Sequence, residues 1–96
     1  MELKDFFTEY MNQDGKFFDF KVIATREAKS KDGEIYKVGD ISKTINASSY
    51  EELKQKIKLF VTLCCSETYG VYVKTLWIEP EVKSEEINLT FMAEET

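Results

Sequence analysis

Residues 16–46, KFFDFKVIATREAKSKDGEIYKVGDISKTIN, decide the fold, because two runs of alternating apolar and polar residues flank the dipeptide Asp32-Gly33. Alternation with a period of two is typical of a strand with one buried face, and Asp-Gly accepts the positive φ of a tight turn. The alternation of the second run slips at Gly39, and a β-bulge at Gly39-Asp40 would restore it. The segment therefore predicts a β-hairpin over about 16–46 with a bulged second strand.

One helix is expected before this hairpin and another after it. The first spans about 2–12, where apolar residues recur at helical spacing. The second is the central helix, about 49–67, which begins at a capping-box spacing within residues 48–52. The apolar stripe of the central helix consists of Leu53, Ile57, Phe60, Val61 and Cys64. Three lysines are expected mostly off that stripe, namely Lys54, Lys56 and Lys58.

A second hairpin is expected over about 70–93. Residues 71–78 are rich in β-branched and aromatic residues and end before Pro80, which cannot donate to a ladder. After a polar connection, a last strand is predicted from the alternation of Ile87, Leu89 and Phe91 with polar residues.

The element order α-β-β-α-β-β predicts a single α+β domain over 1–96, with a mostly antiparallel four-stranded sheet and the central helix packed on one face. The expected core contact joins two apolar faces of matching period. On the helix these residues are Leu53, Ile57, Phe60 and Cys64, and on the strand they are Phe18, Phe20 and Val22.

The strand at 71–78 presents apolar residues on both of its expected faces. Strict alternation groups Val71 and Val73 with Trp77, and Tyr72 with Leu76 and Ile78. Such a strand is either covered on both sides or forms an interface. The N-terminal helix is one candidate for the second cover, and a homodimer contact is the competing explanation.

The composition removes much catalytic chemistry. The chain has no His, so a Ser-His or Cys-His nucleophile pair is excluded, and its four Gly are scattered rather than gathered in a phosphate loop. Cys64 and Cys65 are adjacent on a predicted helix and cannot bond to each other, so we expect free thiols, with Cys64 the more buried. We therefore expect no catalytic residue, no cofactor and no metal. An enzyme would need a carboxylate or a lysine acting alone in a shallow site.

Charge is the most informative remaining feature. The chain has 13 Lys and Arg against 18 Asp and Glu, and its net charge of −5 equals the local balance of residues 79–96. This acidic region either keeps a sheet edge solvated or docks on a basic surface of another macromolecule, with carboxylates standing where phosphates would stand. Tyr and Trp beside it are favoured interface anchors. The expected partner-binding residues are Tyr72, Trp77, Glu79, Glu81, Glu85 and Glu86.

A nucleic-acid-binding accessory protein is the alternative class. Seven basic residues lie on the first hairpin, and Lys54 and Lys58 are one turn apart on the central helix. The same hairpin carries five acidic residues, and the net charge is opposite to the usual footprint of such proteins. The basic residues of the hairpin are Lys16, Lys21, Arg26, Lys29, Lys31, Lys37 and Lys43.

The chain resembles, in size, charge and element order, the compact inhibitors that phages and mobile elements make against host nucleases, including anti-CRISPR proteins. The resemblance implies a small, non-catalytic, acidic protein-binding or regulatory module with a basic protein partner. No apolar run is long enough for a membrane span, and the first residues lack the pattern of a secretory signal. Free thiols fit a reducing compartment. We therefore expect a cytoplasmic protein.

Overall fold

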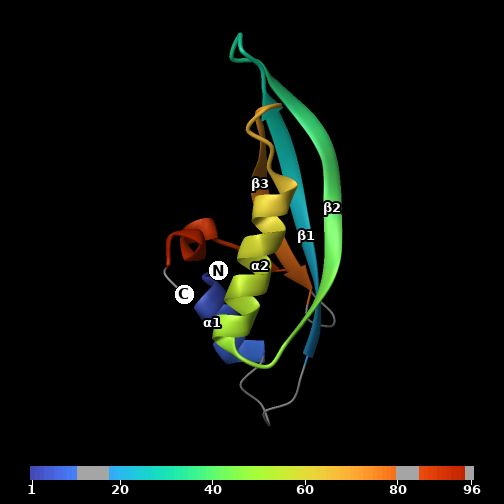
Figure 1. The fold of residues 1–96 in the computed structure, drawn as a ribbon. Helices are drawn as coiled ribbons and strands as arrows, with labels where there is room; N and C mark the ends of the chain where they lie inside the picture. Colours follow the sequence, from blue (N-terminus) through green and yellow to red (C-terminus); the bar gives the residue numbers. More distant parts are fainter. Residues whose placement is uncertain (11–17, 80–84, 95–96) are drawn as a thin grey trace.

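The fold is a four-stranded antiparallel sheet with helices packed on one face (Figure 1), and the predicted α+β class and element order are confirmed. The structure is a computed structural model that describes residues 1–10, 18–79 and 85–94. Its elements in chain order are α1 (Leu3–Tyr10), β1 (Phe18–Lys29), β2 (Ile35–Ala47), α2 (Tyr50–Cys64), β3 (Val71–Glu79), β4 (Glu85–Ile87) and the 3-10 helix η1 (Leu89–Ala93).

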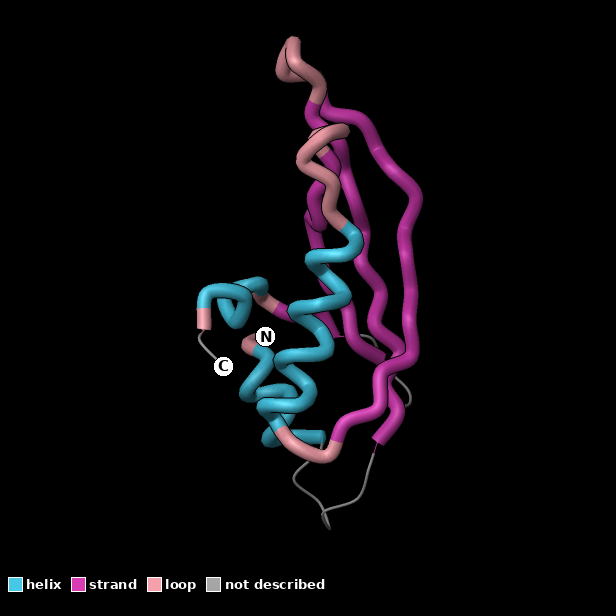
Figure 2. The backbone as a smooth tube through the Cα atoms, in the orientation of Figure 1, coloured by secondary structure: helices cyan, strands magenta, loops and turns pink. Residues whose placement is uncertain are grey.

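The strands are ordered β2-β1-β3-β4, so β1 is paired on both sides and β2 forms one edge of the sheet. Figure 2 shows α2 running along this sheet, with α1 and η1 gathered beside its first turns. Among the residues that the structure describes, no helix is both long and apolar enough to cross a membrane.

The bulge predicted in the first hairpin is confirmed. Ala24 pairs with Ile41 and Arg26 pairs with Val38, so Thr25 faces two residues of β2, Gly39 and Asp40. The turn before β2 also agrees with the sequence, because Gly33 has a φ of 83°, in the left-handed region that favours glycine.

A second bulge, in β3, corrects the prediction that this strand is apolar on both faces. Thr25 pairs with Thr75 and Arg26 pairs with Val73, so Lys74 is the extra residue. The extra residue shifts the alternation by one position. As a result Val73, Leu76 and Ile78 are all buried in the core. The other apolar and aromatic residues of β3 are only partly buried, namely Val71, Tyr72 and Trp77.

The predicted contact between α2 and β1 is confirmed, because Phe20 and Val22 are buried in one cluster with the stripe residues of α2. The side chain of Phe18 lies outside the described part. Lys54 was expected off the stripe, but only 3% of it is exposed. It points into the space beside Tyr50, with its ammonium 5.2 Å from the ring centroid and 3.3 Å from the Glu51 carboxylate.

The N-terminal helix covers the same face as α2, so of the two candidates for a second cover of the 71–78 strand, the N-terminal helix is wrong. The ring of Phe6 packs on that of Phe20 with centroids 5.4 Å apart, and Phe7 packs on Tyr50 of α2 at 5.8 Å. Leu3 and Phe6 belong to the buried core. The face of the sheet opposite α2 is therefore left without α1.

The last strand is shorter than predicted. β4 ends at Ile87, and residues 89–93 form η1 rather than a continued strand. The helical turn lets Phe91 reach the core, where it is 2% exposed, while Leu89 and Met92 pack against the core from the same side. A hairpin lasting to residue 93 is therefore wrong.

Candidate functional site

The site that the fold presents is the face of the sheet opposite α2, which we call the open face. In the described part of the chain α1, α2 and η1 all contribute to the core on the other side. Residues that alternate with the buried ones therefore point to the open face. They include Ile23, Thr25 and Glu27 of β1, Lys37 and Asp40 of β2, Tyr72, Lys74, Thr75, Trp77 and Glu79 of β3, and Glu86 of β4.

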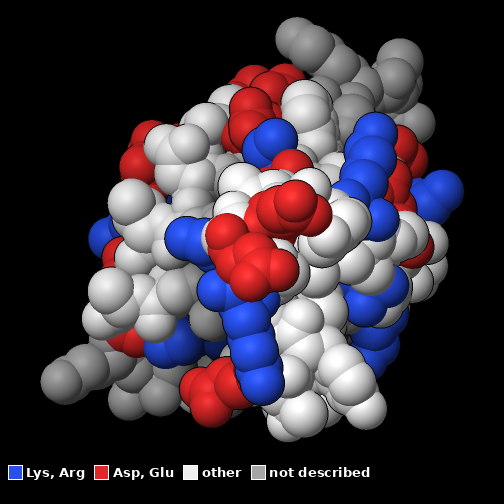
Figure 3. Space-filling model, turned by 90° about the horizontal axis from the view of Figure 1, so that it is seen from above, with Lys and Arg blue, Asp and Glu red and all other residues white. Residues whose placement is uncertain are grey.

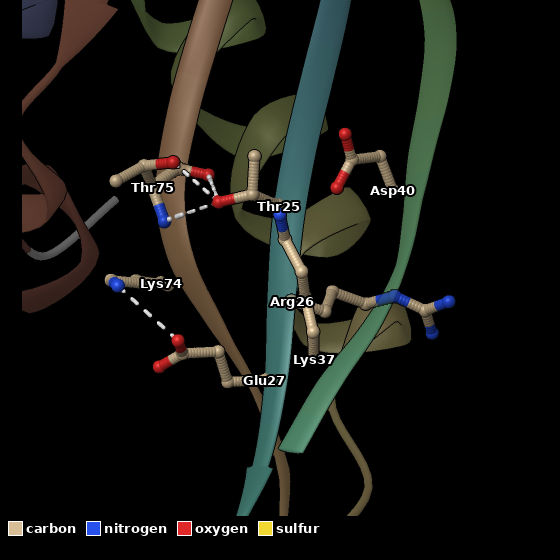
Figure 4. Close-up of a pocket in the computed structure, with 7 residues that line it drawn as sticks. All are labelled: Thr25, Arg26, Glu27, Lys37, Asp40, Lys74 and Thr75. Atoms are coloured by element: carbon tan, nitrogen blue, oxygen red, sulfur yellow. Dashed lines mark hydrogen bonds and ion pairs between the residues drawn. The ribbon is translucent and has the colours of Figure 1, made fainter. Parts of the chain in front are cut away.

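A shallow hollow of about 270 Å³ lies where the two bulges meet (Figure 4). Both neighbours of β1 carry an extra residue at the level of Thr25 and Arg26, and bulges bend a strand and increase its twist. The paired bulges thus explain why the sheet is hollowed here. The lining residues are Thr25, Arg26, Glu27, Lys37, Asp40, Lys74 and Thr75.

Two threonines form the floor of this hollow and position Trp77. The Thr75 backbone N donates to Thr25 Oγ1 at 3.1 Å, and the two hydroxyls are in direct contact. The Trp77 indole Nε1 donates to Thr75 Oγ1 at 3.2 Å. The polar edge of the Trp77 ring is therefore tied to the sheet while the ring remains partly exposed on the open face.

Glu27 accepts two side-chain hydrogen bonds on the other side of the hollow. Tyr72 Oη donates to Glu27 Oε1 at 2.9 Å, and Lys74 Nζ donates to Glu27 Oε2 at 3.2 Å. These hydrogen bonds hold the pKa of the Glu27 carboxyl below its usual value, and the bond to Glu27 raises the pKa of Tyr72. Glu27 is therefore a carboxylate, and it fixes Tyr72 and Lys74 together.

The structure brings four of the six predicted partner-binding residues to the open face. Trp77 faces Glu86 across the β3–β4 pair, Glu79 follows two residues later, and Tyr72 lies beyond the hollow. Glu85 does not join them, because it pairs with the buried Ile78 and so points to the helix side.

Tyr10 of α1 lies on the same side as Glu85. Burial raises the pKa of Tyr10, and the negative charges of Glu9 and Glu85 and hydrogen bonds to them raise it further. Glu81, the sixth predicted residue, lies outside the described residues.

The hollow itself was missed by the sequence reasoning. The signal is the spacing of apolar residues in β3, where Val73 and Leu76 are separated by two polar residues, Lys74 and Thr75, instead of one. Strict alternation cannot bury both apolar residues, so this spacing indicates a bulge. The bulge then implies a partner position on β1, which is Thr25.

The lysines expected to bind nucleic acid do not form one surface. Lys54 is buried, Lys56 donates to the Asn46 carbonyl at 2.5 Å, and Lys58 donates to the Glu94 carbonyl at 2.6 Å. On the hairpin, Lys37 belongs to the open face, whereas Lys43 pairs with the buried Val22 on the helix side. Figure 3 views the molecule from the top of Figure 1 and shows basic and acidic groups side by side at this end.

Groups that could carry metal or thiol chemistry are not assembled in the described part of the chain. Within those residues, Cys, Asp and Glu nowhere form a group of three that could hold a metal ion. Cys64 is buried and Cys65 is exposed, as expected. Burial raises the pKa of the Cys64 thiol, so a smaller fraction of it is ionised to the reactive thiolate at neutral pH.

Comparisons with protein-family models, with curated proteins and with solved structures gave no match to this chain, so its function must be inferred from the geometry of the open face.

Proposed function

We propose that this chain is a non-catalytic protein-binding module that docks on a basic protein surface through its open face. The observation that carries the proposal is Trp77, which is partly exposed on the open face and held by its hydrogen bond to Thr75. An aromatic ring that is already fixed loses little entropy on binding, and Trp is enriched among the residues that dominate interface energies.

The neighbours of Trp77 favour a cationic partner group. Glu86 lies opposite Trp77 on β4, and Glu79 is on the same face two residues away. A Lys or Arg side chain can stack on an indole ring and pair with a carboxylate at the same time. Trp77 and Glu86 together thus match a basic surface better than they match a neutral or acidic one, and Glu79 adds a carboxylate that has Lys21 opposite it on β1.

The partner class that we propose is an enzyme that itself binds nucleic acid. Such enzymes carry basic surfaces for phosphate, and a rigid carboxylate-bearing face can compete for them. The overall charge of −5 supports this reading, because it favours approach to a basic partner and disfavours direct contact with phosphate. An inhibitor of a host nucleic-acid-binding enzyme is the corresponding role.

The test is affinity capture from the native host with the unmodified chain and two variants, followed by mass spectrometry. Trp77→Ala and the double variant Glu79→Lys with Glu86→Lys should each lose the captured protein. The unmodified chain should release it as the salt concentration rises, because exposed charges are screened beyond about 8 Å at physiological ionic strength.

Matched controls come from the loop after α2. Tyr69 is 77% exposed, so Tyr69→Ala removes an aromatic ring away from the open face, and Glu67→Lys reverses an exposed charge there. Both controls should keep the partner. Retention by the Trp77→Ala and double-charge variants, or recovery of nucleic acid in place of a protein, would contradict the proposal.

A further inference from the structure

The two edges of the sheet differ in how they are covered. Along β4 the α-ammonium group of Met1 donates to the Glu86 carbonyl at 3.0 Å, and the Asn88 backbone N donates to the Met1 carbonyl at 2.7 Å. At the other edge lies β2, which has 13 residues and pairs only with β1 in the described sheet. Figure 1 shows β2 as a long outer strand beside α2. A long unpaired edge is a template for another strand.

Charged residues along β2 occur at every third position with alternating sign. They are Lys37, Asp40 and Lys43 of β2, together with Glu34, which directly precedes the strand. This pattern has a symmetry that matters for an antiparallel contact of the strand with itself. Reversing the order of the four positions places each acidic residue opposite a basic one.

We propose that β2 pairs in antiparallel fashion with β2 of a second copy of this chain, about a two-fold axis between Val38 and Gly39. A two-fold axis makes each contact occur twice. Lys37 then faces Asp40 of the other copy, and Lys43 faces Glu34, which gives four pairs of opposite charge. Cross-strand pairs of this kind stabilise a sheet, whereas like charges destabilise it.

The faces of the strand match in this register because of the bulge. Before the bulge Tyr36 lies on the helix side, because it pairs with Ala28, two residues from the Arg26–Val38 pair. After the bulge Ile41 lies on the helix side, because it pairs with the buried Ala24. Pairing Tyr36 with Ile41 therefore joins two helix-side residues, and pairing Lys37 with Asp40 joins two open-face residues. The phase change falls at the axis, where Val38 meets Gly39, a residue without a side chain.

Neighbouring registers lack this agreement. Shifting the axis by one residue toward the end of β2 places Lys37 opposite Ser42 and Asp40 opposite Gly39. Shifting it the other way places Lys37 opposite Val38 and Asp40 opposite Ile35. In both cases Lys37 and Asp40 lose their opposite charges.

Exposed leucines of α2 lie beside the same edge. Lys56 reaches the Asn46 carbonyl of β2, so the stripe of α2 that continues from Lys56 at helical spacing, Leu59 and Leu63, is on the β2 side. Leu59 is 59% exposed and Leu63 is 72% exposed. Pairing places the two helices on the same side of one continuous sheet, with these leucines toward the joint.

The level of the helix fits the position of the axis. Ser66, two residues after α2, forms a bridge with Val71, Val71 pairs with Ala28, and Ala28 pairs with Tyr36 of β2, so the end of α2 lies near the level of the proposed axis. Leu63 belongs to this last turn of α2 and so lies at the same level. Arg26 Nε also donates to the Gly39 carbonyl at 2.9 Å, which holds the bulge in place.

The experiment is a charge swap across the proposed axis, read by light scattering and sedimentation equilibrium over a wide range of concentration. The unmodified chain should reach twice the monomer mass. Lys37→Asp and Asp40→Lys should each raise the dimer dissociation constant by about tenfold or more, because two attractive pairs become repulsive. The double variant carrying both changes should recover dimerisation, since the pairs are restored with their signs exchanged.

The matched control is Lys4→Asp on the exposed side of α1, which changes the net charge by the same amount and should leave the dimer intact. Circular dichroism and melting temperature confirm that all the variants fold. A chain that remains monomeric at every concentration overturns the proposal, because the edge would then be free for another occupant. A dimer that ignores Lys37→Asp, or that the double variant does not recover, overturns it as well. None of these readouts depends on the partner of the open face.

Discussion

At the scale of single residues, Glu27 organises the open face. It accepts hydrogen bonds from Tyr72 and Lys74 with its two oxygens, and both donors come from β3. One carboxylate on β1 thereby fixes the positions of an aromatic ring and a cation on the neighbouring strand. Its contribution depends on its charge, because Tyr72 and Lys74 act as donors to it.

Glu27→Gln should therefore change how stability depends on pH. The pKa of Glu27 is lower in the folded chain than its ordinary value of 4.5, so ionisation favours folding. This stabilisation is complete above the unfolded pKa and is lost as pH falls through the folded pKa. Glu27→Gln should lower the melting temperature at neutral pH and flatten its decline in acid.

The measurement is thermal unfolding at a series of pH values from neutral to acidic. Glu67→Gln, in the exposed loop after α2, is the matched control and should follow the unmodified chain. Parallel pH profiles of Glu27→Gln and the unmodified chain would show that Glu27 has no such role.

At the scale of elements, what the sequence predicts depends on whether the signal is local. The turn at Gly33 and the bulge at Gly39 carry their own conformational signals, and both are where the sequence places them. The core stripe of α2 is likewise predicted by the helical spacing of its apolar residues.

Other features of the elements and of the site depend on contacts between distant segments. α1 covers the same face as α2 because Phe6 packs on Phe20. β4 is followed by η1, which places Phe91 in the core. Lys54 follows the same rule in part, because one of its carboxylate contacts, at 3.7 Å, is with the distant residue Glu94. For the open face, the sequence predicts the aromatic and acidic residues but not the hollow, whose floor requires Thr25 and Thr75 to meet.

The two faces of β1 should respond very differently to truncation. Phe20 is 1% exposed and packs on Phe6, whereas Ile23 is partly exposed on the open face. Phe20→Ala should lower the free energy of unfolding by about 3–5 kcal/mol because it leaves a cavity in the core. Ile23→Ala should lower the free energy of unfolding by about 1 kcal/mol, because less of the apolar surface of Ile23 is buried on folding.

Chemical denaturation with urea measures both values on the same chain. Equal losses for Phe20→Ala and Ile23→Ala would contradict the assignment of the faces. A small loss for Phe20→Ala alone would show that the contact between α1 and β1 contributes little to stability.

At the scale of the whole molecule, the two ends of the described chain are joined to each other. Asn88 Nδ2 donates to Glu2 Oε1 at 2.9 Å, and the Thr90 hydroxyl contacts the other oxygen of Glu2. These bonds lower the pKa of Glu2 and keep it ionised. Residues near the start of the chain therefore complete the edge formed by β4 and η1.

This arrangement predicts a gradient of local stability across the sheet. β1 is paired on both sides, whereas β4 has three residues and depends on its contacts with Met1 and Glu2. Backbone amides that depend on few contacts exchange their hydrogens through local opening, and those at the centre of a sheet exchange through global unfolding. In hydrogen-exchange mass spectrometry, amides of β1 should exchange slowest and those of residues 85–93 fastest.

Glu2→Ala should accelerate exchange in residues 85–93 and leave β1 unchanged, because it removes the contacts to Asn88 and Thr90 but no core group. Asp5→Ala, which removes an exposed carboxylate from the first turn of α1, is the matched control and should leave both regions unchanged. Faster exchange spread evenly over all four strands would mean that the sheet opens as one unit, and that the ends of the chain stabilise the whole fold rather than the β4 edge alone.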